Sequence, residues 1–250
     1  MPLQIVPIPA FEDNYIWLLA SGSQAVCVDP GEAAPVAGYL KRHGLMLTQI
    51  WVTHHHRDHT GGIEALLRDA PGCAVYGNRD IRAATHTVGE GSRLAAFGCG
   101  VEVWQLPGHT DAHLAYVLDD GGRRHVFCGD TLFSAGCGRV FTGTPEQLFH
   151  SLQRLNSLPD DTLFYPAHEY TAANLRFAAH IEPANPDVLE AQAGLAVPSL
   201  PVSLAHERRI NPFLRTHLPQ VAQRTAALSG QAPADECAVF TAMRELKNGF

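Results

Sequence analysis

Short runs of apolar or alternating residues dominate the first two thirds of the chain and predict β-strands. Gly, Pro and Asp bound these runs, as is typical of strands joined by turns. We expect strands at residues 3–7, 15–20, 25–28, 49–53, 74–76, 101–105, 114–117, 125–128 and 162–165. Helices are expected between them, so this part of the chain reads as an α/β domain.

The clearest helix signal covers residues 145–158. Thr144 is suited to the N-cap, Pro145 to the first helical position, and Gln147 completes a capping-box pattern. Pro159 ends the segment.

The pattern changes near residue 171. Strand signals fade, and Ala-rich segments with helical spacing follow at residues 172–181, 186–196, 204–209, 219–228 and 235–247. We therefore predict two domains, an α/β domain over residues 1–171 and a smaller helical domain over residues 172–250.

Composition and charge restrict the class of protein. The chain has 250 residues, 46% of them hydrophobic, and a formal net charge of −7. This balance argues against a nucleic-acid partner, because phosphate binding needs clustered Lys and Arg. No basic leader and no apolar run of membrane-spanning length is evident, so we expect no membrane partner and a cytoplasmic location. The six cysteines contain no C-x-x-C pair and are expected to be reduced.

The most informative segment is Thr53–His59, which reads THHHRDH and follows the apolar run at residues 49–52. Imidazoles and a carboxylate at the end of a strand are typical of a metal-binding loop on a rigid scaffold. His55 would point away from its neighbours if the strand geometry continued, so we leave it out of the ligand set.

Three further candidate ligands lie downstream, each after a predicted strand: His109, Asp130 and His168. We expect strand ends to bring them to one rim together with the loop. The full set comprises seven residues: His54, His56, Asp58, His59, His109, Asp130 and His168.

Seven donors are too many for one four-coordinate ion and fit two ions that share a carboxylate. The donors are all nitrogen and oxygen, which suits zinc, iron or manganese. Two such ions can activate water at neutral pH, and no G-x-S-x-G nucleophile motif is present.

These residues resemble the metallo-β-lactamase superfamily, with its H-x-H-x-D-H motif followed by separated His, Asp and His. Within it the chain closely resembles the glyoxalase II (hydroxyacylglutathione hydrolase) family over nearly its whole length. The segments that carry the likeness include THHHRDHTGG at 53–62, GDTLFSAGCG at 129–138, HEYT at 168–171, NPFLR at 211–215 and the final R-x-x-K at 244–247.

The resemblance implies an αββα sandwich followed by a helical domain, in a monomer. It implies one ion, with zinc expected, on His54, His56 and His109, and a second on Asp58, His59 and His168. Asp130 would bridge the two ions, and Asp58 and Asp130 would act in catalysis with a metal-bridging hydroxide.

The same resemblance places the glutathione contacts on Arg139, Phe141, Tyr170, Arg244 and Lys247. Many relatives carry Lys and Tyr where this chain has Arg139 and Phe141. Arg139 keeps the cation, whereas Phe141 lacks a hydroxyl that would bind the substrate.

The implied reaction is hydrolysis of S-D-lactoylglutathione to D-lactate and glutathione, the second step of methylglyoxal detoxification. Its chemistry suits the site, because thiols ionise near pH 8.5 and a thiolate leaves without a strong general acid.

Two alternatives belong to other classes. A persulfide dioxygenase would use one iron ion, and a non-catalytic protein would bind glutathione conjugates without turnover. A β-lactamase is disfavoured, since those enzymes commonly have Cys where this chain has Asp130.

Overall fold

The computed structural model describes residues 2–250, and their contacts divide into two compact units. The first, here called the sheet unit, comprises the chain up to Gln105 together with Ala112–Gly129. The second, the helical unit, comprises Leu106–Asp111 and Asp130–Phe250. The boundary predicted near residue 171 rests on a change of sequence pattern and stays a prediction.

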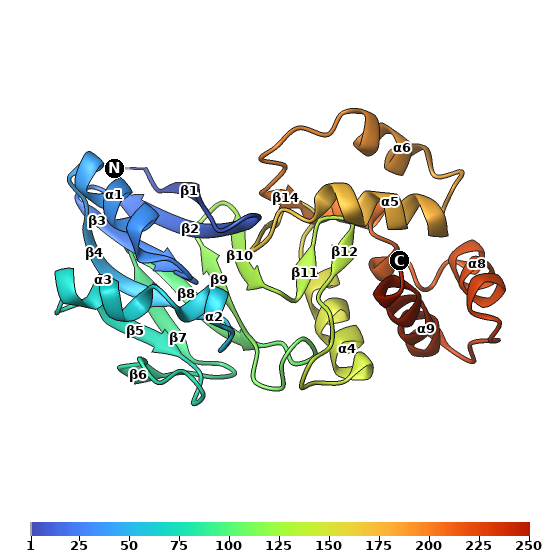
Figure 1. The fold of residues 1–250 in the computed structure, drawn as a ribbon, viewed down its shortest axis with the longest axis horizontal. Helices are drawn as coiled ribbons and strands as arrows, with labels where there is room; N and C mark the ends of the chain where they lie inside the picture. The colour runs from blue at the N-terminus through green and yellow to red at the C-terminus, as the bar shows by residue number, and fades with distance from the viewer. Residues whose placement is uncertain (1) are drawn as a thin grey trace. The chain divides into compact units, whose positions relative to one another are not determined.

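The sheet unit begins with a six-stranded sheet in the order β1 to β6 (Figure 1). Its strands are β1 (Gln4–Ala10), β2 (Asn14–Ser21), β3 (Gln24–Val28), β4 (Met46–Trp51), β5 (Ala74–Gly77) and β6 (His86–Thr87). β1, β2 and β3 pair antiparallel, and β3 to β6 pair parallel. The crossover helices α1 (Ala33–His43) and α3 (Ile63–Asp69) bury Val36, Ile63 and Leu66 in the same apolar cluster as Ile50 of β4.

Four further strands of the sheet unit pair antiparallel in the order β10, β9, β8, β7. They are β7 (Arg93–Ala96), β8 (Cys99–Gln105), β9 (Leu114–Asp119) and β10 (Arg124–Gly129). Trp51 of β4 stacks on Tyr116 of β9 at 5.2 Å between ring centroids. The Tyr116 hydroxyl donates to the carbonyl of Val52 at 3.0 Å. The two layers of strands therefore face each other as a sandwich, and the expected α/β class is confirmed.

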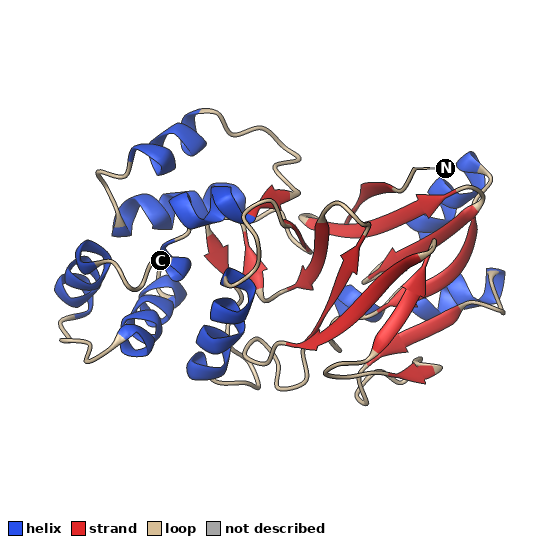
Figure 2. Ribbon diagram, turned by 180° about the vertical axis from the view of Figure 1, so that it is seen from behind, coloured by secondary structure: helices blue, strands red, loops and turns tan. Residues whose placement is uncertain are grey.

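The helical unit contains most of the helices coloured blue in Figure 2. Its elements are β11 (Leu132–Phe133), β12 (Gly136–Cys137), α4 (Pro145–Asn156), β13 (Leu163–Pro166), α5 (Thr171–Ile181), α6 (Pro186–Ala193), β14 (Val202–Ser203), α7 (Leu204–Ile210), the 3₁₀ turn η1 (Pro212–Leu214), α8 (Pro219–Ser229) and α9 (Glu236–Asn248). The capping box predicted for α4 is present, with Thr144 and Gln147 bonded reciprocally.

Each strand predicted from the sequence lies close to an observed strand, whereas β7 and the two-residue strands were not predicted. β6, β11, β12 and β14 have two residues each, too few to show a period. The strand expected at 49–53 ends at Trp51, so the reason given for excluding His55 is wrong, although its side chain is indeed exposed. None of the helices formed by residues 2–250 has both the length and the hydropathy needed to span a membrane.

Candidate metal centre

In the sheet unit, the metal-binding loop leaves β4 and enters a single helical turn, α2 (Arg57–Thr60), which carries Asp58 and His59. Thr53, His54 and His59 are fully buried, whereas His56 and Asp58 are partly exposed. The short turn after a buried strand places two imidazoles and a carboxylate within one small region, as the sequence predicts.

Asp29, at the end of β3, fixes this loop. Its carboxylate accepts hydrogen bonds from the Thr53 amide and hydroxyl, each at 2.7 Å. It also lies 3.1 Å from Nδ1 of His59. A proton on Nδ1 of His59 would face this carboxylate and would leave the Nε2 lone pair available to a metal ion. That Nε2 atom lies 3.4 Å from Oδ2 of Asp58.

The tautomer of His54 follows from the same network. The Thr53 hydroxyl gives its proton to Asp29 and therefore accepts from Nδ1 of His54 at 3.0 Å. The Nε2 lone pair of His54 then faces Nδ1 of His56, 3.0 Å away. His54 also stacks on the buried ring of His113, with centroids 4.8 Å apart. The loop therefore presents oriented nitrogen donors, as metal sites with a supporting outer shell do.

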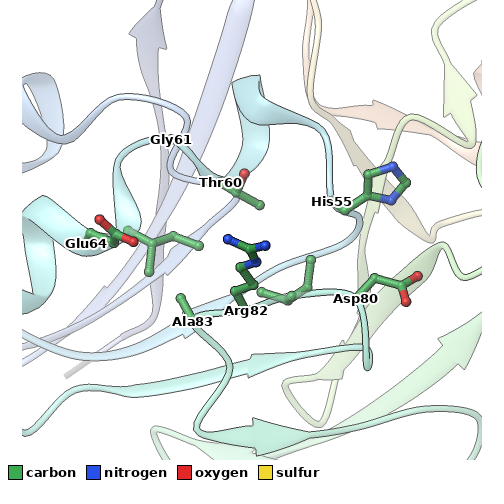
Figure 3. A pocket seen from close by; sticks show the side chains of 9 residues that line it. His55, Thr60, Gly61, Glu64, Asp80, Arg82 and Ala83 are labelled. Atoms are coloured by element: carbon green, nitrogen blue, oxygen red, sulfur yellow. The ribbon is translucent and has the colours of Figure 1, made fainter.

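His55 has a different environment from its neighbours. Its exposed side chain lines a cavity of about 600 Å³ with Thr60, Glu64, Asp80 and Arg82 (Figure 3). Figure 3 shows the His55 ring beside Asp80, with the Arg82 guanidinium between Thr60 and Ala83. Leaving His55 out of the predicted ligand set agrees with this position.

In the helical unit, Asp130 lies between two predicted histidine ligands. Its Oδ2 atom is 3.5 Å from Nε2 of His109, and its Oδ1 atom is 3.5 Å from Nε2 of His168. Nδ1 of His109 lies 2.7 Å from the carbonyl of Arg139 and must donate to it, so Nε2 presents a lone pair toward Asp130. Two imidazole rings thus flank one carboxylate, on opposite oxygens.

These donors fit a bound cation. Asp130 is only 7% exposed, and a buried carboxylate that faces imidazole lone pairs is favourable only with positive charge between the partners. In each unit an outer oxygen, of Asp29 or Arg139, faces Nδ1 of a histidine, which leaves the Nε2 atom available as a metal ligand. Nitrogen and oxygen donors of this kind suit divalent metals.

Of the predicted substrate contacts, Arg139, Phe141 and Tyr170 are exposed residues of the helical unit. The Phe141 ring meets the His109 ring edge-on at 5.2 Å and is 58% exposed. The Tyr170 ring stacks on His168 at 4.7 Å. Two of the three therefore place an aromatic ring against a predicted metal ligand.

The remaining two, Arg244 and Lys247, lie one turn apart on α9. The Arg244 guanidinium is buried and donates to the carbonyls of Cys137 and Gly138 at 3.1 and 3.4 Å. Lys247 is half-buried and donates to the carbonyl of Ala173 at 3.3 Å. Burial, and then the charge of Arg244, lower the pKa of Lys247 to about 8.

Sequence reasoning did not identify several residues that support the site. Asn14 donates to Oδ2 of Asp58 at 3.2 Å. The Thr53 hydroxyl bonds to both Asp29 and His54 and so links these two side chains. In the helical unit, Glu207 and Asn211 form hydrogen bonds with the turn that follows Asp130.

Comparison with known proteins finds two family models, one over each part of the chain. The model of the metallo-beta-lactamase superfamily matches residues 10–168, and the model described as hydroxyacylglutathione hydrolase C-terminus matches residues 169–250. A hydroxyacylglutathione hydrolase of Neisseria gonorrhoeae is 60% identical, with 99% of this chain and 100% of that protein covered.

Two solved structures extend the likeness. The crystal structure of ETHE1 from Myxococcus xanthus is 27% identical, with a TM-score of 0.67 over 98% of this chain and 91% of that one. The structure of TTHA1623 in a di-iron-bound form is 27% identical, with a TM-score of 0.62 over 84% of this chain and 100% of that one. The chain therefore has the metallo-β-lactamase fold and belongs to the hydroxyacylglutathione hydrolase family of thioester hydrolases.

Proposed function

We propose that this chain hydrolyses S-D-lactoylglutathione to D-lactate and glutathione. The observation that carries the proposal is the pair of oriented donor sets, His54, His56, Asp58 and His59 in one unit and His109, Asp130 and His168 in the other. Identity of 60% with a hydroxyacylglutathione hydrolase over 99% of the chain supports the substrate class.

We propose that the two donor sets together hold two divalent ions, with zinc as the expected metal. His54, His56 and His109 would hold one ion, Asp58, His59 and His168 the other, and Asp130 would bridge them. When bound, the ions supply activated water at neutral pH and stabilise the negative charge that develops on the thioester carbonyl.

The residues of the chain prepare this chemistry. Asn14 donates a hydrogen bond to the Asp58 carboxylate at 3.2 Å, which orients this carboxylate before substrate binds. Asp130 lies between His109 and His168 and would be held by the bound ions. Arg139 and Lys247 supply cations for the carboxylates of glutathione on an otherwise acidic chain. Tyr170 and Phe141 are exposed aromatic residues whose rings contact the predicted ligands His168 and His109.

The test is an assay of the purified chain with S-D-lactoylglutathione, combined with elemental analysis of the same sample. We expect two metal ions per chain and rapid thioester cleavage, both lost after chelation. Asp130→Asn keeps the shape of the side chain but removes the charge, and we expect it to lose metal and activity together. Absence of turnover by protein shown to hold two ions would contradict the proposal.

The same sample separates the two alternatives. One iron per chain with oxygen uptake on glutathione persulfide would support the dioxygenase. Binding of a non-hydrolysable thioether analogue without thioester turnover would support a glutathione-conjugate binding protein. Sedimentation of the same sample tests the proposal that the chain is a monomer.

A further inference from the structure

The hairpin β11–β12 connects the residues that the proposed function uses. Leu132 pairs with Cys137 and Phe133 with Gly136, so only Ser134 and Ala135 form the turn. Asp130 lies two residues before the hairpin, and Arg139 and Phe141 follow it. Gly138 donates its amide to the carbonyl of Thr131 at 3.1 Å, which closes the base of the hairpin beside Asp130. The position of the hairpin therefore sets the position of Asp130.

The backbone conformation of this turn is not one that its residues favour by themselves. Ala135 has a φ of 54°, in the left-handed region where residues other than Gly, Asn and Asp are rarely found. Such a conformation persists only where surrounding contacts impose it. Side chains of α7 and α5 supply these contacts.

A buried carboxylate from α7 binds both residues of the turn. Oε1 of Glu207 accepts from the Ser134 hydroxyl at 2.9 Å, and Oε2 accepts from the Ala135 amide at 2.9 Å. Glu207 has no exposed surface, and no cation pairs with it in the part of the chain that the structure describes. A buried carboxylate without a cation is costly, and hydrogen bonds from Ser134, Ala135 and Asn211 offset this cost.

Two asparagines form further hydrogen bonds with the same turn. Nδ2 of Asn211 donates to Glu207 at 2.9 Å and also lies 3.2 and 2.9 Å from the carbonyls of Phe133 and Gly136. Nδ2 of Asn174, on α5, donates to the carbonyl of Ser134 at 3.0 Å. All four residues from Phe133 to Gly136 are therefore bound by buried side chains from α5 and from the end of α7.

From these contacts we infer that Glu207, with Asn211 and Asn174, is a positioning residue that keeps Asp130 in its metal-binding place through the hairpin. The inference rests on the proposed function. It assigns to the C-terminal helices a part in metal binding that is separate from contact with substrate. None of the three side chains needs to touch metal or substrate for this role.

The test compares Glu207→Ala with two matched variants. Glu207→Ala removes the acceptor for Ser134 and Ala135, whereas Glu207→Gln can keep it, because the amide oxygen accepts from Ala135 while the Ser134 hydroxyl turns to accept from the amide group. Glu182→Ala serves as a stability control, since Glu182 is also buried but pairs with Arg215 through two contacts of 2.8 and 2.9 Å, away from the hairpin.

Metal affinity is measured by competition with a chromophoric chelator, well below the melting temperature of each variant. We expect Glu207→Ala to bind metal about 10- to 100-fold more weakly, as loss of an outer-shell partner does. We expect Glu207→Gln and Glu182→Ala to bind as the wild type does. Adding Ala135→Gly to Glu207→Ala should restore part of the affinity, because glycine adopts the left-handed turn without strain.

Wild-type metal affinity in folded Glu207→Ala would overturn the inference. If Glu207→Ala does not fold, Asn174→Ala replaces it, with a several-fold loss of affinity expected and an unchanged affinity again contradicting the inference. Chelator competition does not depend on turnover. A wild-type chain that binds metal but fails to cleave the thioester would therefore disprove the proposed function and leave this test intact.

Discussion

The carboxylate of Asp29 lies 3.1 Å from Nδ1 of His59, so the other ring nitrogen, Nε2, is the one that faces Asp58. The same carboxylate receives the Thr53 amide and hydroxyl, and through Thr53 it also sets the tautomer of His54. One residue at the end of β3 therefore orients two predicted ligands that follow β4.

Removal of this carboxylate should weaken metal binding without removing any ligand. We expect Asp29→Ala to lower metal affinity about 10- to 100-fold, the usual cost of losing an outer-shell partner. Asp29→Asn keeps one acceptor oxygen and should lose less. Chelator competition measures both variants, and equal affinities for Asp29→Ala and the wild type would contradict the role given to Asp29.

Deprotonation of Lys247 should lower kcat/KM at alkaline pH. Its pKa is lowered to about 8, so the cation that we propose for glutathione binding is lost as the pH rises through that value. A charge-assisted hydrogen bond contributes about 1.5–3 kcal/mol, and kcat/KM should fall by about tenfold or more above pH 8. Arginine stays protonated, so Lys247→Arg should extend the plateau to higher pH. Superimposable pH profiles for the two proteins would show that Lys247 does not bind the substrate through its charge.

Contact between Phe141 and the substrate can be tested by adding a hydroxyl group to the ring. The exposed Phe141 ring lies beside His109, and the resemblance to the glyoxalase II family leads us to expect a Tyr at this position. Phe141→Tyr should restore one hydrogen bond worth about 1 kcal/mol, which corresponds to a KM about fivefold lower with kcat little changed. Phe141→Leu serves as the control for loss of the ring, and steady-state kinetics of the three proteins decide the matter. An unchanged KM in Phe141→Tyr would place the lost hydroxyl away from the substrate.

The candidate ligands could be selected from the sequence because their signal is local. Each follows an apolar strand long enough to recognise, as with His109 after β8 and Asp130 after β10. The supporting residues were harder to identify, because their partners are distant in the chain. Asp29 lies 24 residues before Thr53, and Glu207 lies 73 residues after Ser134. No periodicity links such pairs, and the hairpin they support is too short to show one.

Burial of Glu207 gives a prediction about stability and pH. Desolvation raises its pKa from 4.5 to about 7, against the hydrogen bonds from Asn211, Ala135 and Ser134, which lower it. The folded state therefore holds the Glu207 proton more tightly than the unfolded state does. The free energy of unfolding of the protein should therefore fall as the pH rises from about 4.5 to 7, and should then level off. Glu207 should account for a decrease on the order of 3 kcal/mol.

Glu207→Gln isolates this contribution, because glutamine does not titrate and can keep the hydrogen bonds. Urea unfolding of both proteins at pH 5 and pH 8, with the same metal content, gives the difference directly. We expect the variant to gain stability relative to the wild type between pH 5 and pH 8, while other titrating groups, the metal ligands among them, cancel in the comparison. A relative stability independent of pH would mean that Glu207 has the same pKa in the folded and unfolded chains. Its hydrogen bonds to the hairpin would then fully offset the cost of its burial.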